Sequence, residues 1–170
     1  MKKILIIKHG SLGDIISATS AIYDIKNHYK GDKLSILTST KFKNFFLDSK
    51  LFDTIIIDNK NGIKGTFVLI KKILNNHFDI IIDLQNSQRT SFYIFLIRFF
   101  SKVEINGTTF FATKRYKNNP HSLTHVVEGL SNQIELLNIN TSRKPHLEWL
   151  NDKSYDFSNI NNDQFIIINP

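Results

Sequence analysis

Short aliphatic runs that do not alternate with polar residues constrain the fold of this chain more than any other feature. They lie at residues 4–7, 34–37, 54–57, 78–83 and 103–105. A strand that faces solvent on one side alternates apolar and polar residues, whereas a strand buried on both sides does not. The runs therefore predict a parallel sheet that is covered by helices on both faces.

The segments between these runs have the spacing of helices. The first follows a glycine-containing loop, with apolar residues from Ile15 to Ile25 at largely helical spacing. Further helices are expected at residues 42–47, 66–74, 90–100 and 122–137, with 62–65 as a loop and 90–100 largely buried. The alternation predicts an α/β fold, a Rossmann-like, doubly wound parallel sheet. In such sheets ligands bind beyond the carboxyl ends of the strands, which directs attention to residues 8–14 and 83–89.

Composition restricts the environment and the partners. The chain has 170 residues, enough for one sizeable core, and no cysteine, which fits a reducing compartment. Its net charge of +7 would suit nucleic acid, an anionic membrane surface or a phosphorylated substrate. No nucleic-acid-binding motif occurs, so we expect no nucleic-acid partner. The most apolar stretch, residues 92–100, is too short to span a bilayer, and a cytoplasmic location is predicted.

The loop at residues 8–14 is the strongest candidate for chemistry. Gly10 and Gly13 allow a sharp turn, and the N–H groups of a helix start can hold an anion. The loop matches neither the dinucleotide-binding glycine pattern nor the phosphate-binding loop of NTPases. Ser11 and Asp14 have the spacing of a capping box, in which both side chains only satisfy backbone N–H groups. Alternatively, Asp14 accepts a proton from a hydroxyl that attacks an electrophile.

Three segments resemble the bacterial heptosyltransferases of glycosyltransferase family 9. They are ILIIKHGSLGDII at residues 4–16 followed by ATSAI at 18–22, DLQ at 83–85 with RT at 89–90, and HVVE at 125–128. The similarity extends over nearly the whole chain in the right order. The chain departs from the family at Ser20, where proline is common, at Asn86, where glycine is common, and at His9-Gly10, which replaces a small hydroxylated pair.

The resemblance implies a GT-B architecture of two Rossmann-like domains and transfer of heptose from ADP-heptose to the lipopolysaccharide inner core, with inversion. Asp14 would then be the general base. The residues expected to hold the anionic acceptor are Lys8, Gly10, Ser11, Gly13 and Arg89. For Arg89 and Lys8, solvated or structural roles are equally compatible with their positions. No cofactor or metal is expected, and the nucleotide-sugar donor should bind mainly the C-terminal domain. Because the acceptor is a membrane lipid, peripheral contact with the inner face of the inner membrane is expected.

The expected domain organisation has three parts. Residues 1–140 form the N-terminal acceptor-binding domain, 141–164 a linker, and 165–170 the start of a truncated C-terminal nucleotide-sugar-binding domain. The apolar run at 165–168 could instead pair at the edge of the first sheet. The chain is expected to be a fragment that is inactive alone. Two alternatives are a non-catalytic anion-binding α/β module and a GT-B transferase with a different sugar donor.

A single acidic residue, Asp83, and one pair of polar residues, His125 and Glu128, are interpreted as structural. Asp83 ends a predicted strand beside the binding edge, and we expect it to accept hydrogen bonds from loop N–H groups. His125 and Glu128 are one helical turn apart, which is typical of a helix surface and does not make a metal site.

Overall fold

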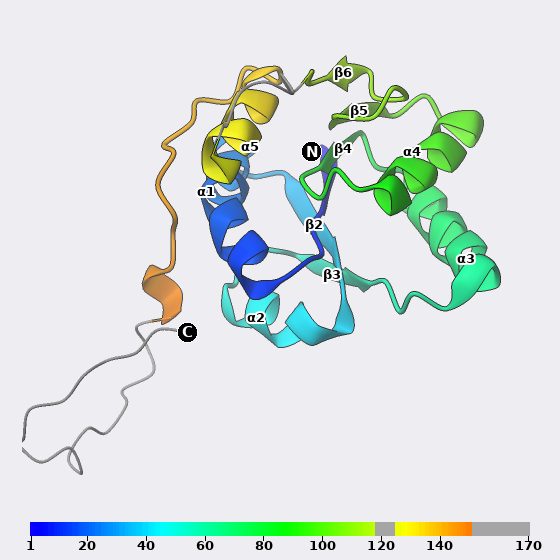
Figure 1. Ribbon diagram of the computed structural model, residues 1–170, viewed down its shortest axis with the longest axis horizontal. Helices are drawn as coiled ribbons and strands as arrows, with labels where there is room; N and C mark the ends of the chain where they lie inside the picture. Colours follow the sequence, from blue (N-terminus) through cyan, green and yellow to red (C-terminus); the bar gives the residue numbers. More distant parts are fainter. Residues whose placement is uncertain (118–124, 151–170) are drawn as a thin grey trace, which may run out of the picture.

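The structure is a computed structural model that describes residues 1–117 and 125–150. Their strands form one parallel sheet of six in the order β3-β2-β1-β4-β5-β6 (Figure 1). The strands are β1 (Lys3–Ile7), β2 (Lys33–Thr38), β3 (Thr54–Ile57), β4 (Ile80–Asp83), β5 (Glu104–Gly107) and β6 (Lys114–Arg115). Strand β1 is central, and Ile6 lies opposite Ile36 of β2 and Ile82 of β4.

Helices cover both faces of this sheet (Figure 1). They are α1 (Leu12–His28), α2 (Lys43–Asp48), α3 (Gly62–Asn75), α4 (Gln88–Phe100) and α5 (Val126–Glu135), with short 3₁₀ turns η1 (Thr40–Phe42) and η2 (Glu148–Leu150). Helices α1, α2 and α5 pack on one face, and α3 and α4 on the other. The predicted doubly wound, Rossmann-like fold is therefore confirmed.

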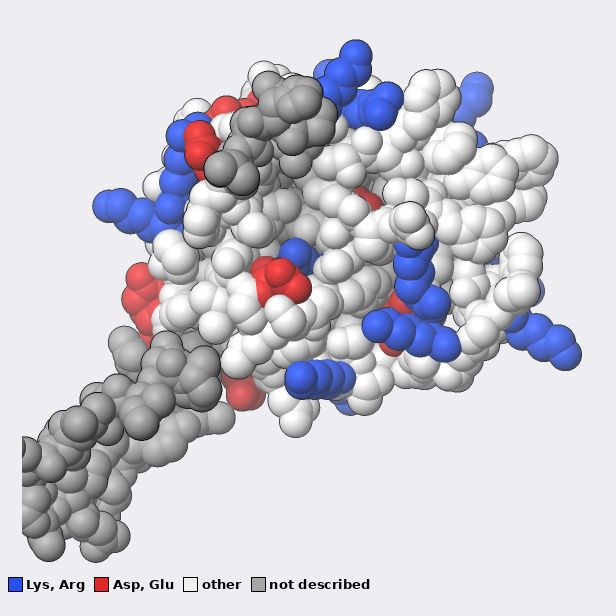
Figure 2. Space-filling view, in the orientation of Figure 1, with Lys and Arg blue, Asp and Glu red and all other residues white. Residues whose placement is uncertain are grey.

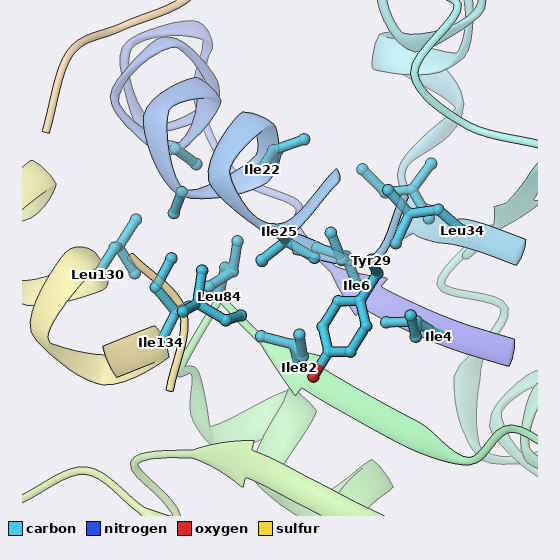
Figure 3. Close-up of a cluster of buried hydrophobic side chains, with 14 of the residues drawn as sticks. Ile4, Ile6, Ile22, Ile25, Tyr29, Leu34, Ile82, Leu84, Leu130 and Ile134 are labelled. Atoms are coloured by element: carbon cyan, nitrogen blue, oxygen red, sulfur yellow. The ribbon is translucent and has the colours of Figure 1, made fainter. Parts of the chain in front are cut away.

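Alternate residues of each strand serve the two hydrophobic cores. Ile4 and Ile6 point into the cluster formed with α1 and α5 (Figure 3), whereas Leu5 and Ile7 point into the cluster formed with α3 and α4. All four side chains are fully buried. Each such side chain stabilises the fold by roughly 1.5–3 kcal/mol relative to an exposed one. This two-sided burial explains why the strand sequences do not alternate.

Helix α3 begins four residues earlier than expected, so the prediction of a loop at 62–65 is wrong. Gly62 has a φ of +61° and opens the helix, and the Thr66 hydroxyl donates to its carbonyl at 3.0 Å. At Gly65 a Cβ atom would lie 2.7 Å from Cβ of Asn61. This glycine is explained by close approach within a helix rather than by a turn.

Helix α4 begins at Gln88, where Ser87 and Thr90 form a capping box. The expectation that residues 90–100 are largely buried holds only for the inner side, which Tyr93, Ile94 and Ile97 occupy. For the outer side the expectation is wrong, because its phenylalanine side chains are only partly covered within the described part of the chain. The exposed fractions there are 47% for Phe92, 41% for Phe95, 77% for Phe99 and 66% for Phe100.

The last elements differ from expectation in smaller ways. Strand β5 continues through Asn106 and Gly107, and β6 is a polar two-residue strand that the apolar pattern could not indicate. Helix α5 has His125 as its N-cap; the expected residues 122–124 lie outside the described residues.

Residues 141–149 pack along the outside of α1 and α2 (Figure 1). The His146 ring stacks on Tyr23 with 3.7 Å between centroids, and Trp149 meets Phe45 edge-on at 4.7 Å. The expected strand at 165–168, with the rest of the expected second domain, lies outside the described residues. Across residues 1–117 and 125–150, no helix is both long and apolar enough to cross a membrane.

Candidate functional site

A hollow of ≈ 390 Å³, the crevice, lies at the carboxyl ends of β1 and β4. These neighbouring strands continue into α1 on one face and α4 on the other, so the crevice is at the switch point where doubly wound sheets bind ligands. Its lining residues are Lys8, Asp14, Leu84, Gln85, Asn86, Thr108, Tyr116, His125, Val126, Gly129, Leu130 and Gln133.

The loop from β1 to α1 is closed by a complete capping box. The Ser11 hydroxyl accepts from the Asp14 N–H at 3.3 Å, while the Ser11 N–H and hydroxyl donate to Oδ2 of Asp14 at 3.0 and 2.9 Å. Gly10 has a φ of +108°, and a Cβ atom there would lie 2.9 Å from the same Oδ2. Glycine is therefore required for the carboxylate to fold back over the loop.

The Asp14 carboxylate is exposed and lines the crevice. The backbone and side-chain hydrogen bonds from Ser11 lower its pKa, and Lys8 lowers it further. Both hydrogen bonds that it accepts from described residues end on Oδ2, so Oδ1 is open to a ligand. The two readings of Asp14 are thus compatible, because one oxygen caps the helix and the other faces outward.

Lys8 directly follows β1 and lines the floor of the crevice. Its side chain is buried, and Nζ donates to the Leu84 carbonyl at 3.1 Å, which ties the end of β1 to the end of β4. Burial lowers the pKa of Lys8, and the nearby carboxylates of Asp14 and Asp83 act in the opposite direction. Lys8 is therefore a buried cation between two carboxyl groups at the floor of the crevice.

The turn after β4 is held by Asp83, as expected from the sequence. Its Oδ1 accepts from the backbone N–H groups of Gln85 and Asn86 at 3.0 and 3.1 Å. Asp83 is fully buried, and burial raises its pKa to about 6. Asn86 has a φ of +50°, a region that favours glycine and that asparagine tolerates better than most residues. The departure from glycine at this position therefore keeps the turn.

A buried amide network supports the rear wall of the crevice. Asn86 Nδ2 donates to Gln133 Oε1 at 2.7 Å, and Gln133 Nε2 donates to the Asp83 carbonyl and to Asn106 Oδ1 at 2.9 and 3.0 Å. Asn106 Nδ2 returns a bond to the Gln133 carbonyl at 3.0 Å. Sequence reasoning missed Gln133 and Asn106. Neither residue stands out in the sequence, because Asn106 follows the predicted strand at 103–105 and Gln133 is one of several polar residues on a predicted helix.

Arg89 lies apart from the crevice lining. Its Nε and Nη2 donate to the two oxygens of Asp58 at 3.2 and 3.1 Å, and Tyr93 donates to the same carboxylate at 2.7 Å. Burial alone would raise the pKa of Asp58, but the hydrogen bonds that it accepts outweigh this effect, so its pKa is lowered. The buried His9 ring lies 3.7 Å from Asp58, and burial lowers the pKa of His9 to about 4.

The structure therefore brings Lys8, Gly10, Ser11, Gly13 and Asp14 together at one edge of the sheet, whereas Arg89 is not part of the crevice lining and is held by Asp58. His125 lines the crevice as the N-cap of α5, where its Nδ1 accepts from the Val127 N–H at 3.4 Å. Within residues 1–117 and 125–150, no three side chains gather as a metal site would require.

The fold and this crevice define a class of protein: a Rossmann-like α/β domain with an outward-facing carboxylate and a buried cation at its switch point. No protein-family model matches the chain. It is 23% identical to the lipopolysaccharide core heptosyltransferase OpsX of Haemophilus influenzae, over 97% of this chain and 48% of that protein.

Solved structures of similar proteins agree. The glycosyl transferase family 9 structure from Veillonella parvula matches with a TM-score of 0.68 at 19% identity, covering 85% of this chain and 43% of that one. The Escherichia coli heptosyltransferase WaaC with ADP matches with a TM-score of 0.67 at 14% identity, covering 84% and 49%. The resemblance to family 9 heptosyltransferases is confirmed, and the chain spans about half the length of the relatives it matches.

Proposed function

We propose that this chain is the acceptor-binding part of an enzyme that transfers heptose from ADP-heptose to the lipopolysaccharide inner core with inversion. The observation that carries the proposal is the open Asp14 carboxylate beside the buried Lys8, in the switch-point crevice. The similarity to a lipopolysaccharide core heptosyltransferase supports the sugar and the acceptor. Binding of ADP by a structural relative, WaaC, supports the donor.

In this proposal Asp14 is the general base. The acceptor hydroxyl gives its proton to Oδ1 as its oxygen forms a bond to the anomeric carbon of the sugar. The bond from that carbon to the phosphate oxygen breaks, and its electron pair leaves with the nucleoside diphosphate. Attack opposite the leaving group inverts the anomeric centre. The lowered pKa keeps Asp14 ionised before the reaction, and transfer is favoured because the hydroxyl becomes acidic as it attacks.

The loop around Asp14 would position the acceptor. Gly10 and Gly13 let the chain approach closely, Ser11 fixes the carboxylate, and Lys8 supplies positive charge below it. Two N–H groups of Arg89 donate to Asp58, and the Arg89 side chain is 36% exposed. We propose that its remaining N–H groups contact a phosphate or carboxylate of the acceptor.

The donor would be held mainly by a second Rossmann-like domain that faces the crevice, and no cofactor takes part. The acceptor sugar is attached to a lipid, so the enzyme would work in the cytoplasm in peripheral contact with the inner membrane. The net charge of +7 supports an anionic acceptor and an anionic surface.

Exchange of Asp14 for asparagine in the intact gene product tests the proposal. With ADP-heptose and a heptose-deficient core acceptor, Asp14→Asn should lower kcat by about 10²- to 10⁴-fold, because proton removal is lost. Asparagine can still cap the helix, so the variant should stay folded. The matched control is Asp32→Asn, at the opposite edge of the sheet, where the Asp32 side chain accepts from the Lys2 N–H. Unchanged turnover in a folded Asp14→Asn enzyme would exclude Asp14 as the base. A panel of nucleotide sugars on the unmodified enzyme tests the donor.

A further inference from the structure

An exposed aromatic stripe runs along the outer side of α4. Phe92, Phe95 and Phe99 have the i, i+3, i+7 spacing of one helix face, and Phe100 adds a neighbouring ring 5.0 Å from that of Phe99. The opposite side of the helix is buried in the core. A helix that is apolar all round is normally covered on all sides. Here one side is uncovered within the described part of the chain.

The connection between β5 and β6 extends this surface. The Phe111 ring lies 5.0 Å from Phe95, and Phe110 lies 5.9 Å from Phe111. Phe110 is 76% exposed, almost as much as Phe99 at 77%. Figure 2 shows a wide area without charged side chains over this corner of the molecule, where Figure 1 has α4 and the β5–β6 connection. The residues of this aromatic patch are Phe92, Phe95, Phe99, Phe100, Phe110 and Phe111.

Positive charge surrounds the aromatic patch. Residues 98–117 contain five basic residues and one acidic residue, Glu104, which is only partly exposed. Arg98 on α4, Lys102 just after this helix, and Lys114 and Arg115 of β6 are all exposed. The Arg115 guanidinium lies 5.6 Å from the Phe110 ring centroid. Aromatic rings fringed by lysine and arginine complement a surface that is apolar within and anionic at its boundary.

We propose that the aromatic patch docks this protein on an anionic lipid bilayer. The phenylalanine rings enter the boundary between headgroups and acyl chains, and the surrounding basic side chains contact lipid phosphates. The choice of a bilayer rests on the proposed function, whereas the surface itself rests on these exposed side chains. A protein partner would need acidic side chains to match this fringe, while an anionic bilayer offers negative charge over the whole patch.

The position of the patch also connects the bilayer to the crevice. Thr108, which begins the connection that carries Phe110 and Phe111, and Tyr116, which directly follows β6, line the crevice. A sugar attached to a membrane lipid would therefore enter the crevice across this connection. The lipid anchor would remain at the patch while its sugar reaches Asp14.

Vesicle co-sedimentation of the 170-residue chain tests this docking without donor or acceptor. The chain should bind vesicles of phosphatidylcholine mixed with phosphatidylglycerol and bind much less to phosphatidylcholine alone. The Phe99→Ser, Phe110→Ser double variant should lower the partition coefficient at least about tenfold, since two exposed anchors are lost. The Arg98→Glu, Lys114→Glu double variant should lower it by about fivefold or more. The controls Leu47→Ser on α2, itself 51% exposed, and Lys30→Glu, Lys43→Glu should bind like the unmodified chain.

A fluorophore gives a second measurement that does not depend on loss of binding. The chain has no cysteine, so Phe110→Cys carries a single dansyl group, which should shift to the blue on anionic vesicles. The same label at Leu47→Cys should not shift. If the unmodified chain does not bind anionic vesicles, or if the aromatic double variant binds equally well, the proposal is wrong. Gel filtration that shows a dimer lost in that variant would also overturn it, because a second copy would then cover the patch. Neither result bears on Asp14.

Discussion

At Asp83, burial disfavours the ionised carboxylate, and neighbouring hydrogen-bond donors and Lys8 offset this effect only in part. Two backbone N–H groups donate to Oδ1, and the Lys8 ammonium is close enough to lower the pKa, yet burial dominates and raises the pKa to about 6. Oδ2 has no hydrogen-bond partner among the described residues. The side chain therefore holds the turn beside the crevice, but its carboxyl is buried away from water, which disfavours its charged form.

Exchange of Asp83 for asparagine should remove a pH dependence of stability. Between pH 3.8 and about 6 the folded protein holds a proton at Asp83 that the unfolded chain has released. The contribution of this carboxyl to the free energy of unfolding therefore falls as the pH rises through about 6. From about pH 4 to about pH 7, Asp83→Asn should gain roughly 2 kcal/mol relative to the unmodified chain. Urea unfolding at several pH values measures this difference.

The control for this experiment is Asp79→Asn. Asp79 is exposed at the start of β4 and accepts from the Lys3 N–H at 2.7 Å. A pH-independent difference for Asp83→Asn would mean that the carboxyl ionises as readily in the folded chain as in the unfolded one.

At the scale of elements, the order of strands and helices could be predicted because each strand that is buried on both faces is a continuous aliphatic segment in the sequence. The loop from β1 to α1 was readable as well, since the capping box is local in sequence. What could not be read depends on distant partners. Gln133 and Asn106 are 27 residues apart, and Arg89 meets Asp58 across 31 residues. The apolar residues of α4 likewise do not tell which side of the helix is covered.

Removal of the Gln133 amide should loosen the attachment of α5 to the sheet. Gln133→Leu leaves Asn86 Nδ2, Asn106 Oδ1 and the Asp83 carbonyl without their partner, and each buried polar group left unpaired costs roughly 1–3 kcal/mol. We expect a loss of at least about 2 kcal/mol in the free energy of unfolding. Asn132→Leu is the control, because among the described residues the Asn132 side chain accepts a hydrogen bond from the exposed Arg143 and is not part of the buried network. Equal stability of the two variants would show that the network contributes little.

At the scale of the whole molecule, the crevice has its floor and one wall in this chain. The floor is formed by the ends of β1 and β4, and α5 forms the wall. The relatives that it matches are about twice as long. If this part binds the acceptor and another domain binds the nucleotide sugar, as proposed, this chain alone should not bind the nucleotide.

Titration calorimetry of the 170-residue chain with ADP should detect no binding with a Kd of about 1 mM or better, because the proposed adenosine-binding residues belong to another domain. The same titration of the intact gene product is the positive control. Binding in the millimolar range or tighter by the chain alone would contradict the proposed division.

The hydrogen bond between Asn86 and Gln133 should make the evolution of these two positions interdependent. Asn86 occupies a left-handed turn that glycine fills without strain, but glycine cannot donate to Gln133 Oε1 or accept from the Thr108 N–H. A relative that carries glycine at the position of Asn86 must satisfy its counterpart of Gln133 in another way. Substitutions at these two positions should therefore covary among relatives, and a single exchange at either one should be rarer than the paired change.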